Sequence, residues 1–555
     1  MKFGGDVKFT KDDIDNLRTE FGAYSYNNVQ DLITDYTFVT DPTFTDPSQA
    51  NVNLKGKRYA NYNQGFGLAA YTLKTPDVAL FFQDNWRLSP TFTLNLGLRY
   101  EWQSFGSPQF PNLASATLAA GQTRYSLAEA NSIIAQTTDF PSDKNNLGPR
   151  IGFAWDITGD GKNSFRAGYG LYYGRIPNTF LTSPLVNTGA PGSQLATGNI
   201  FNNTVLLDAN NVAIPTPRLG NTLSAVPVRT LAIVVMAREL ENPEIHQGDV
   251  IYERQIAKNT AISVSYLFNF GRKIPSFVDL NLPLPTTTRT YTVVGGDLNG
   301  QTFTTPFFAG ARPISNFGAI IEVQGSAKSS YQALVVQANR RFSNGLQFQT
   351  SYTWAHAKDQ GQQLGTFAPT FPTVSNPFDR SVDDGRSDLD IKHRFVASAV
   401  WDIGESLGWD SGAAGAIFKG FQLAPIISIS SGRSVTGFVS ASPTGGTSSG
   451  LLGSGGPQRT FFVPRGADSR PSTATVDLRA SKRFHFGESM SIEVLGEAFN
   501  LFNRSNFTGI TDTLYTFTAA TNTLTFSPTY LTPTTINNTI NYTPRQVQIG
   551  VRFHF

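Results

Sequence analysis

The stretch FTLNLGLRYEW, residues 92–102, decides the fold class because apolar and polar side chains alternate along its whole length. In an extended strand, one face would carry Leu94, Leu96, Leu98, Tyr100 and Trp102, and the other Thr93, Asn95, Gly97, Arg99 and Glu101. The same alternation recurs at residues 151–157, 346–354 and 546–555, whereas helical spacing is found only at residues 127–136. The sequence therefore predicts an all-β protein with one short helix.

Alternation is found both in soluble β-sandwiches and in membrane barrels. Strand length separates the two classes. Segments such as 92–102 and 545–555 exceed the ~5–6 residues of a globular strand and match the ~9–11 residues that a tilted membrane-crossing strand needs. Aromatic residues also gather at both ends of the segments, as in Tyr352-Thr353-Trp354 and Phe484-His485-Phe486. Two such girdles are typical of an outer-membrane barrel.

The connections alternate in length. Short turns are expected at 89–90, 158–162, 257–258, 343–345 and 487–489, and long loops at 105–146, 176–245, 272–326, 359–390, 432–472 and 503–544. The intermediate connection 404–419 interrupts the pattern. We count about 15 strands, an odd number, whereas bacterial single-chain barrels have even numbers. The expected fold is a transmembrane antiparallel β-barrel with long extracellular loops and short periplasmic turns.

Composition supports a membrane protein. Charged residues make up 15% of the chain, against ~25% in soluble domains. The net charge of +3 gives no reason to expect a nucleic-acid partner, and the absence of cysteine excludes disulfides and thiolate metal sites. Residues 1–6 lack the apolar stretch of a signal peptide. We therefore expect the natural N-terminus to lie upstream.

Several segments together carry a family resemblance: FFQDNWR (81–87), LNLGLRYE (94–101), NLGPRIGFAWD (146–156), GDGK (159–162) with RAGYGLYY (166–173), SYTW (351–354), SDLDIKHRF (387–395) and EAFNLFN (497–503). In this order they resemble the Oar-like branch of TonB-dependent outer-membrane receptors, whose members contain a carboxypeptidase regulatory-like domain. The resemblance implies a barrel of 22 strands. It makes residues 1–555 a partial barrel, with the signal peptide, β-sandwich domain, plug and first strands absent. The terminal Phe555, with Phe553, resembles the sorting signal read by the barrel-assembly machinery.

A catalytic site is not supported. The motif Gly446-Thr447-Ser448-Ser449-Gly450 matches a nucleophile elbow literally, but no helix is expected after it. The five histidines are scattered, and residues 156–162 fit a hairpin turn better than a calcium loop. Asp383, Asp384, Asp388 and Asp390 could bind a divalent cation, but a solvated junction between loop and strand is the favoured interpretation. We expect no enzyme activity, no metal and no cofactor.

The polar face of the strands is expected to line the lumen, because a charge that faces lipid costs ~2–4 kcal/mol at the membrane midplane. By parity, the lumen-facing residues include Arg99, Glu101, Arg150, Arg166, Arg479 and Arg483. These side chains could pair with one another, contact the plug or touch a passing solute. Structural pairing is favoured.

The resemblance implies uptake of a scarce, bulky solute across the outer membrane, in which TonB pulls on the plug. This chain would supply the wall and the outer loops and would reach the TonB complex only through the absent plug. The other expected partners are outer-membrane lipid, lipopolysaccharide, the barrel-assembly machinery and a small or oligomeric solute. The alternatives are a passive porin or an adhesin and, more remotely, a soluble β-rich enzyme.

Overall fold

The computed structural model describes residues 1–45, 55–197, 200–201, 204–228, 230–361, 372–487, 490–536 and 543–555. One sheet of 16 strands dominates the molecule. Two of these, β12 (Leu231–Met236) and β19 (Gly385–Arg386), lie off the main path, which leaves fourteen antiparallel strands in chain order. The fourteen are β1 (Lys2–Asp15), β5 (Ala70–Ser89), β6 (Phe92–Gln103), β7 (Asp143–Asp156), β8 (Asn163–Tyr173), β13 (Glu244–Ala257), β14 (Thr260–Asp279), β17 (Phe317–Ser343), β18 (Leu346–Asp359), β20 (His393–Asp402), β21 (Phe421–Ser430), β25 (Thr473–Phe486), β26 (Met490–Phe499) and β31 (Gln546–His554).

The main path therefore contains one strand fewer than the count made from the sequence. Each strand pairs with its predecessor in the chain, apart from small elements in the long connections. Among the described residues, the outer edges of β1 and β31 pair with no other strand. The sheet is thus open at both edges, although its strand number is even.

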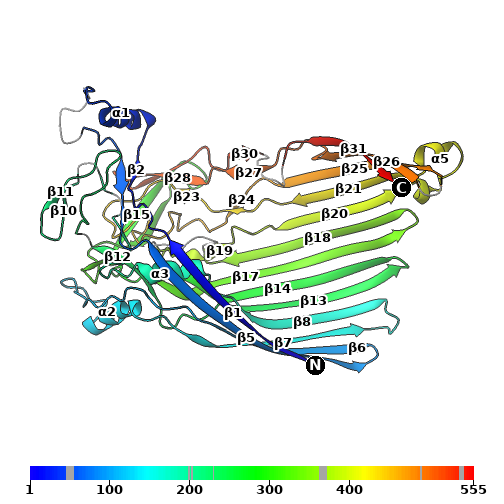
Figure 1. Ribbon diagram of the computed structural model, residues 1–555, viewed down its shortest axis with the longest axis horizontal. Helices are drawn as coiled ribbons and strands as arrows, with labels where there is room; N and C mark the ends of the chain where they lie inside the picture. The colour runs from blue at the N-terminus through cyan, green and yellow to red at the C-terminus, as the bar shows by residue number, and fades with distance from the viewer. Residues whose placement is uncertain are drawn as a thin grey trace.

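The tight turns and the long connections lie at opposite ends of the strands (Figure 1), which confirms the alternation expected from the sequence. In the turn between β17 and β18, Asn344 and Gly345 have φ values of 49° and 69°. Two positive φ values in succession are the requirement of a type I′ hairpin. The intermediate connection forms two short helices, α4 (Ile403–Leu407) and α5 (Gly412–Phe418), at the end that carries the tight turns and the C-terminus.

The long connections fold into a layer of their own, here called the loop layer. Its helices are α1 (Val29–Thr40), α2 (Leu127–Ile134), α3 (Asn178–Val186) and the 3₁₀ turns η2 (Ala135–Thr137) and η3 (Arg380–Asp383). A five-stranded sheet joins β15 (Thr287–Val294), β16 (Thr302–Phe307), β23 (Phe438–Val439), β28 (Thr513–Thr518) and β29 (Thr523–Phe526). The smaller strand pairs use β2 (Ala23–Ser25), β3 (Asn61–Asn63), β4 (Gly65–Phe66), β9 (Leu195–Ala196), β10 (Leu206–Leu207), β11 (Ala213–Ile214), β22 (Ser434–Val435), β24 (Asp468–Ser469), β27 (Phe507–Ile510) and β30 (Pro533–Ile536).

The hydrophobic cores of the chain lie in this loop layer. One core packs α3, with Phe180, Leu181 and Leu185, against Phe277 and Val323 at the ends of β14 and β17. Another gathers the side chains of Tyr291, Val293, Phe308, Leu514, Phe517 and Leu524. The helix expected near residues 127–136 is present as α2 and η2. It begins at a capping box in which Ser126 and Glu129 each accept a hydrogen bond from the other's backbone N–H.

Two strands extend further than the sequence indicated. The loop expected at 272–326 is shorter, because β14 continues to Asp279 and β17 already begins at Phe317. In these extensions Ile320, Ile321 and Val323 are all buried. Alternation disappears because the loop layer covers both faces of the strands. Within the described chain, no helix combines the length and the apolar character needed to span a bilayer.

Candidate functional site

All six side chains predicted from parity lie on one face of the sheet. Directly opposed residues of an antiparallel pair share a face. Arg150 lies opposite Gly97 and Gly170, which places it on the face of Arg99 and Arg166. From Arg166 the register runs without a break across β13, β14, β17, β18, β20 and β21 to β25, where the same face carries Arg479 and Arg483. We call this the polar face.

On β6, β7, β8 and β13 the polar face holds local charge pairs. Arg99 Nε lies 2.8 Å from Glu101 Oε1, and Arg166 Nη2 lies 3.2 Å from Glu253 Oε2. The Arg150 guanidinium lies 4.4 Å from the centre of the Tyr172 ring, a cation–π contact. A hollow of about 500 Å³ opens between these strands, and glycines at 97, 152, 168 and 170 form part of its lining.

The last three strands carry a denser group of charges on the same face. Glu493 on β26 is in direct register with Arg483 on β25 and with Arg552 on β31. Arg479 Nη2 donates a hydrogen bond of 2.9 Å to Glu493 Oε1. A second hollow of about 350 Å³ is lined by Arg479, Asp477 and Glu497, together with side chains of β18, β20 and β21.

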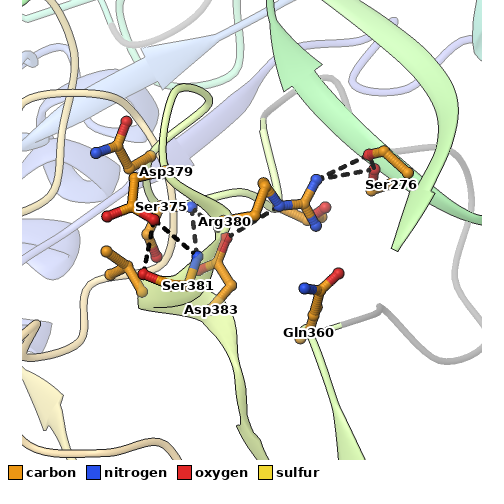
Figure 2. A network of polar contacts seen from close by, with 12 residues as sticks. Ser276, Gln360, Ser375, Asp379, Arg380, Ser381 and Asp383 are labelled. Carbon is orange, nitrogen blue, oxygen red and sulfur yellow. Dashed lines mark hydrogen bonds and ion pairs between the residues drawn. The ribbon is translucent and has the colours of Figure 1, made fainter. Parts of the chain in front are cut away.

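The loop layer contains a buried ionic network that sequence analysis missed (Figure 2). Asp383, at the end of η3, is fully buried and accepts a hydrogen bond from Arg459. Its carboxylate also accepts hydrogen bonds of 3.2 and 3.3 Å from the Ser375 backbone N–H. Burial lowers the pKa of Arg459 to about 10, which still leaves the guanidinium charged at neutral pH. The Arg459–Asp383 pair therefore joins the loop before β20 to the loop before β25.

Arg380 connects this network to the strand ends. Its Nη1 donates to Ser326 Oγ on β17 at 2.8 Å and lies 3.4 Å from Ser276 Oγ on β14. The Nε atom of Arg380 is 3.7 Å from Asp383 Oδ2. Arg465 forms a further buried ion pair with Asp359, the last residue of β18. Arg386 pairs with Asp390 within the loop before β20, and it also donates a hydrogen bond of 3.1 Å to the carbonyl oxygen of Gly466 in the loop before β25.

From the sequence we favoured a solvated junction between loop and strand for the acidic residues 383–390, and this interpretation is wrong for two of them. Asp383 and Asp390 are buried beneath arginines, and only Asp384 and Asp388 are exposed. Among the described residues, no group of three or more His, Asp or Glu side chains is placed to hold a metal ion. The partners of Asp383 and Asp390 include Arg459 and Arg386. Arg459 is 76 residues from Asp383, so no local pattern reveals the pair.

A second buried carboxylate lies near α1. Asp35 Oδ2 accepts hydrogen bonds from the Tyr26 hydroxyl at 2.9 Å and from the Arg58 backbone N–H at 2.6 Å. Burial is the main cause that raises the pKa of Asp35 above its ordinary value.

The motif at 446–450 lies in glycine-rich turns of the loop layer, whereas all five histidines lie in strands of the large sheet. The nucleophile-elbow geometry, a strand followed by a helix, is not formed there.

A family model described as the outer membrane beta barrel domain matches residues 1–548. The chain belongs to this family. It is an integral protein of the outer membrane and crosses the bilayer with its β strands, the long loops lying outside and the tight turns in the periplasm. None of the curated proteins matches the sequence.

Solved structures with a similar arrangement include the outer membrane transporter YddB from Escherichia coli. It has 11% identity and a TM-score of 0.46, with 100% of this chain and 51% of YddB covered. The FrpB iron transporter from Neisseria meningitidis (F3-3 variant) has 10% identity and a TM-score of 0.42, with 99% of this chain and 52% of FrpB covered. This outer-membrane barrel chain therefore spans about half the length of each of these two proteins.

The lipid-facing side of the barrel follows from this membership. Val547, Ile549, Val551 and Phe553 lie on the apolar face of β31 and are 54–81% exposed in the isolated chain. So large an apolar surface is unfavourable in water and is normal for a face that contacts hydrocarbon. Phe555, fully exposed at the C-terminus, continues this apolar series.

Proposed function

We propose that this chain forms the wall and the outer loops of a TonB-dependent transporter that takes up a bulky solute. The folded loop layer is the observation that carries the proposal. A passive pore needs only an open mouth, whereas here the loops have their own hydrophobic cores and buried ion pairs. A preorganised layer of this kind suits ligand capture, because little ordering is then needed on binding. The segments that resemble TonB-dependent receptors support the same function.

The polar face would line the lumen of the transporter. The opposite face carries the apolar side chains, and a charge placed among them would cost ~2–4 kcal/mol at the membrane midplane. On this proposal Arg99, Glu101, Arg166 and Arg479 are held in charge pairs. Arg99, Arg150 and Arg479 also line the two hollows, and the side chain of Arg483 is about half exposed, so a solute could reach them.

Strands outside this chain would close the barrel. Among the residues that the structure describes, no strand pairs with the outer edges of β1 and β31, and a bilayer tolerates such unpaired backbone groups poorly. A total of 22 strands, as the resemblance implies, leaves room for a plug in the lumen, and TonB would act through that plug. The solute could be a glycan or a peptide, since Asn, Thr, Gly and aromatic residues populate the loops.

The test compares strains that lack the complete gene, lack TonB, or lack both. Growth is measured on a panel of scarce nutrients. The transporter predicts a growth defect on at least one nutrient that is the same in all three strains. A defect that appears without the gene but not without TonB would favour a passive porin. Loss of surface attachment with normal growth would favour an adhesin. Translation of the DNA upstream of Met1 adds an independent check, because a plug sequence there fits only the transporter.

A further inference from the structure

A group of basic side chains surrounds one carboxylate at the periplasmic end of the polar face. Arg483 Nη2, Arg552 Nη1 and His554 Nε2 lie 3.8, 3.7 and 3.8 Å from Glu493 Oε2. Arg479 binds the other oxygen of the same carboxylate. Four basic side chains thus converge on one acid, and the Glu493 side chain is only 6% exposed between them.

The N–H groups of these arginines remain available to donate hydrogen bonds to a ligand. Hydrogen bonds between charged groups are usually 2.7–2.9 Å long, so the contacts of 3.7–3.8 Å that Arg483, Arg552 and His554 make with Glu493 Oε2 are not hydrogen bonds. Within the described residues, no hydrogen bond occupies the guanidinium of Arg483 or of Arg552. Both guanidiniums are about half exposed and can therefore be reached from the lumen.

Among the described residues, the neighbouring acids Glu497 and Asp477 form no ion pair with Arg483, Arg552 or His554. Glu497, two same-face positions further along β26, accepts a hydrogen bond from the Gln548 amide. Asp477 accepts the backbone N–H of Asn500 at 2.7 Å. Close to Glu493 Oε2, two guanidiniums and an imidazole therefore meet one carboxylate that Arg479 already shares.

We propose that Arg483, Arg552 and His554 form a binding site for an oxyanion, a phosphate or carboxylate group, at the periplasmic mouth of the lumen. Arg483 and Arg552 lie on either side of Glu493, two strand spacings or ~10 Å apart. An oxyanion with several oxygens can accept hydrogen bonds from more than one of these donors at once. In the transporter, a solute that carries such a group would meet this site as it leaves the barrel. That last step rests on the proposed function, whereas the site itself does not.

Inorganic phosphate is the probe. The full chain in detergent micelles is titrated at constant ionic strength set with sodium chloride, and binding is followed by calorimetry. We expect saturable binding that Arg483→Gln and Arg552→Gln each weaken by about tenfold to a hundredfold, the range for hydrogen bonds to charged groups. Arg166→Gln is the matched control, because it removes the same charge from the same face but from a one-to-one pair with Glu253.

The change Glu493→Gln should affect phosphate affinity in the opposite direction. It removes the carboxylate that competes with phosphate, so phosphate should bind several-fold more tightly. Circular dichroism confirms the β-strand content of each variant before titration. An absence of saturable binding by the unmodified chain, equal weakening in all three arginine variants, or weaker binding by Glu493→Gln would each overturn the site. Intact binding together with failure of the growth test would overturn the proposed function alone.

Discussion

Removal of the Asp383 carboxylate should loosen the loop layer and leave the barrel wall intact. Asp383 is fully buried and Arg459 is only 6% exposed. The change Asp383→Ala would therefore leave an uncompensated guanidinium inside the protein. Loss of one partner from a buried ion pair costs ~3–5 kcal/mol. If this cost falls on local opening, amide exchange in residues 372–392 should accelerate by about a hundredfold to a few thousandfold.

Hydrogen exchange followed by mass spectrometry measures this effect segment by segment. The matched control is Asp384→Ala, since Asp384 is the next residue and is exposed. Its effect should stay within about ±0.5 kcal/mol. Peptides from β6 and β26 should exchange at the same rate in both variants.

A double variant separates charge from packing. Replacement of both partners, Asp383→Leu with Arg459→Met, removes the unpaired charge and keeps similar volume. Such replacements are often neutral or stabilising, so most of the lost protection should return. An acceleration below tenfold in Asp383→Ala, or a double variant as labile as the single one, would refute the assignment of Asp383 as the charge that holds the two loops together.

Three further changes test other parts of the chain. Burial raises the pKa of Asp35, so ionisation of this carboxyl destabilises the fold as pH rises through the folded-state pKa. The change Asp35→Asn should therefore protect the α1 segment from amide exchange at pH 7. It should also abolish the pH dependence of that protection. Ser126→Ala removes the capping box of α2 and should cost ~1 kcal/mol, seen as faster exchange confined to residues 127–137. Deletion of Phe555 should lower the amount of chain recovered in outer-membrane fractions while synthesis is unchanged.

The sequence predicts the barrel wall well because lipid and water impose opposite demands on alternate residues. The period-2 pattern of residues 92–102 and 546–555 gives β6 and β31 nearly to the residue. The prediction is wrong where that constraint ends. The parts of β14 and β17 that extend into the loop layer are covered on both faces, so residues 317–323 read as loop although they form a strand.

The polar sites on the wall could likewise be predicted from the sequence, whereas those in the loop layer could not. Arg99 and Glu101 are two residues apart on one strand, and parity alone brings them together. The Asp383–Arg459 pair depends on how two loops pack, which period-2 alternation does not constrain. The group of basic side chains around Glu493 could be predicted only in part. Parity places Arg479 and Arg483 on the correct face, but Arg552 and His554 arrive only through the register of β26 with β31.

The wall and the loop layer therefore depend on different solvents. The wall strands expose apolar side chains such as Val551 and are stabilised by hydrocarbon on that face. The loop layer carries cores of the soluble type, such as the one around Phe180 and Phe277, and needs no lipid. Arg380 contacts the hydroxyl groups of Ser276 on β14 and Ser326 on β17 while it also contacts Asp383. Since these polar contacts join the two parts, the geometry of the loop layer is tied to the sheet at Arg380 through hydrogen bonds and charge, not through the hydrocarbon-facing side chains.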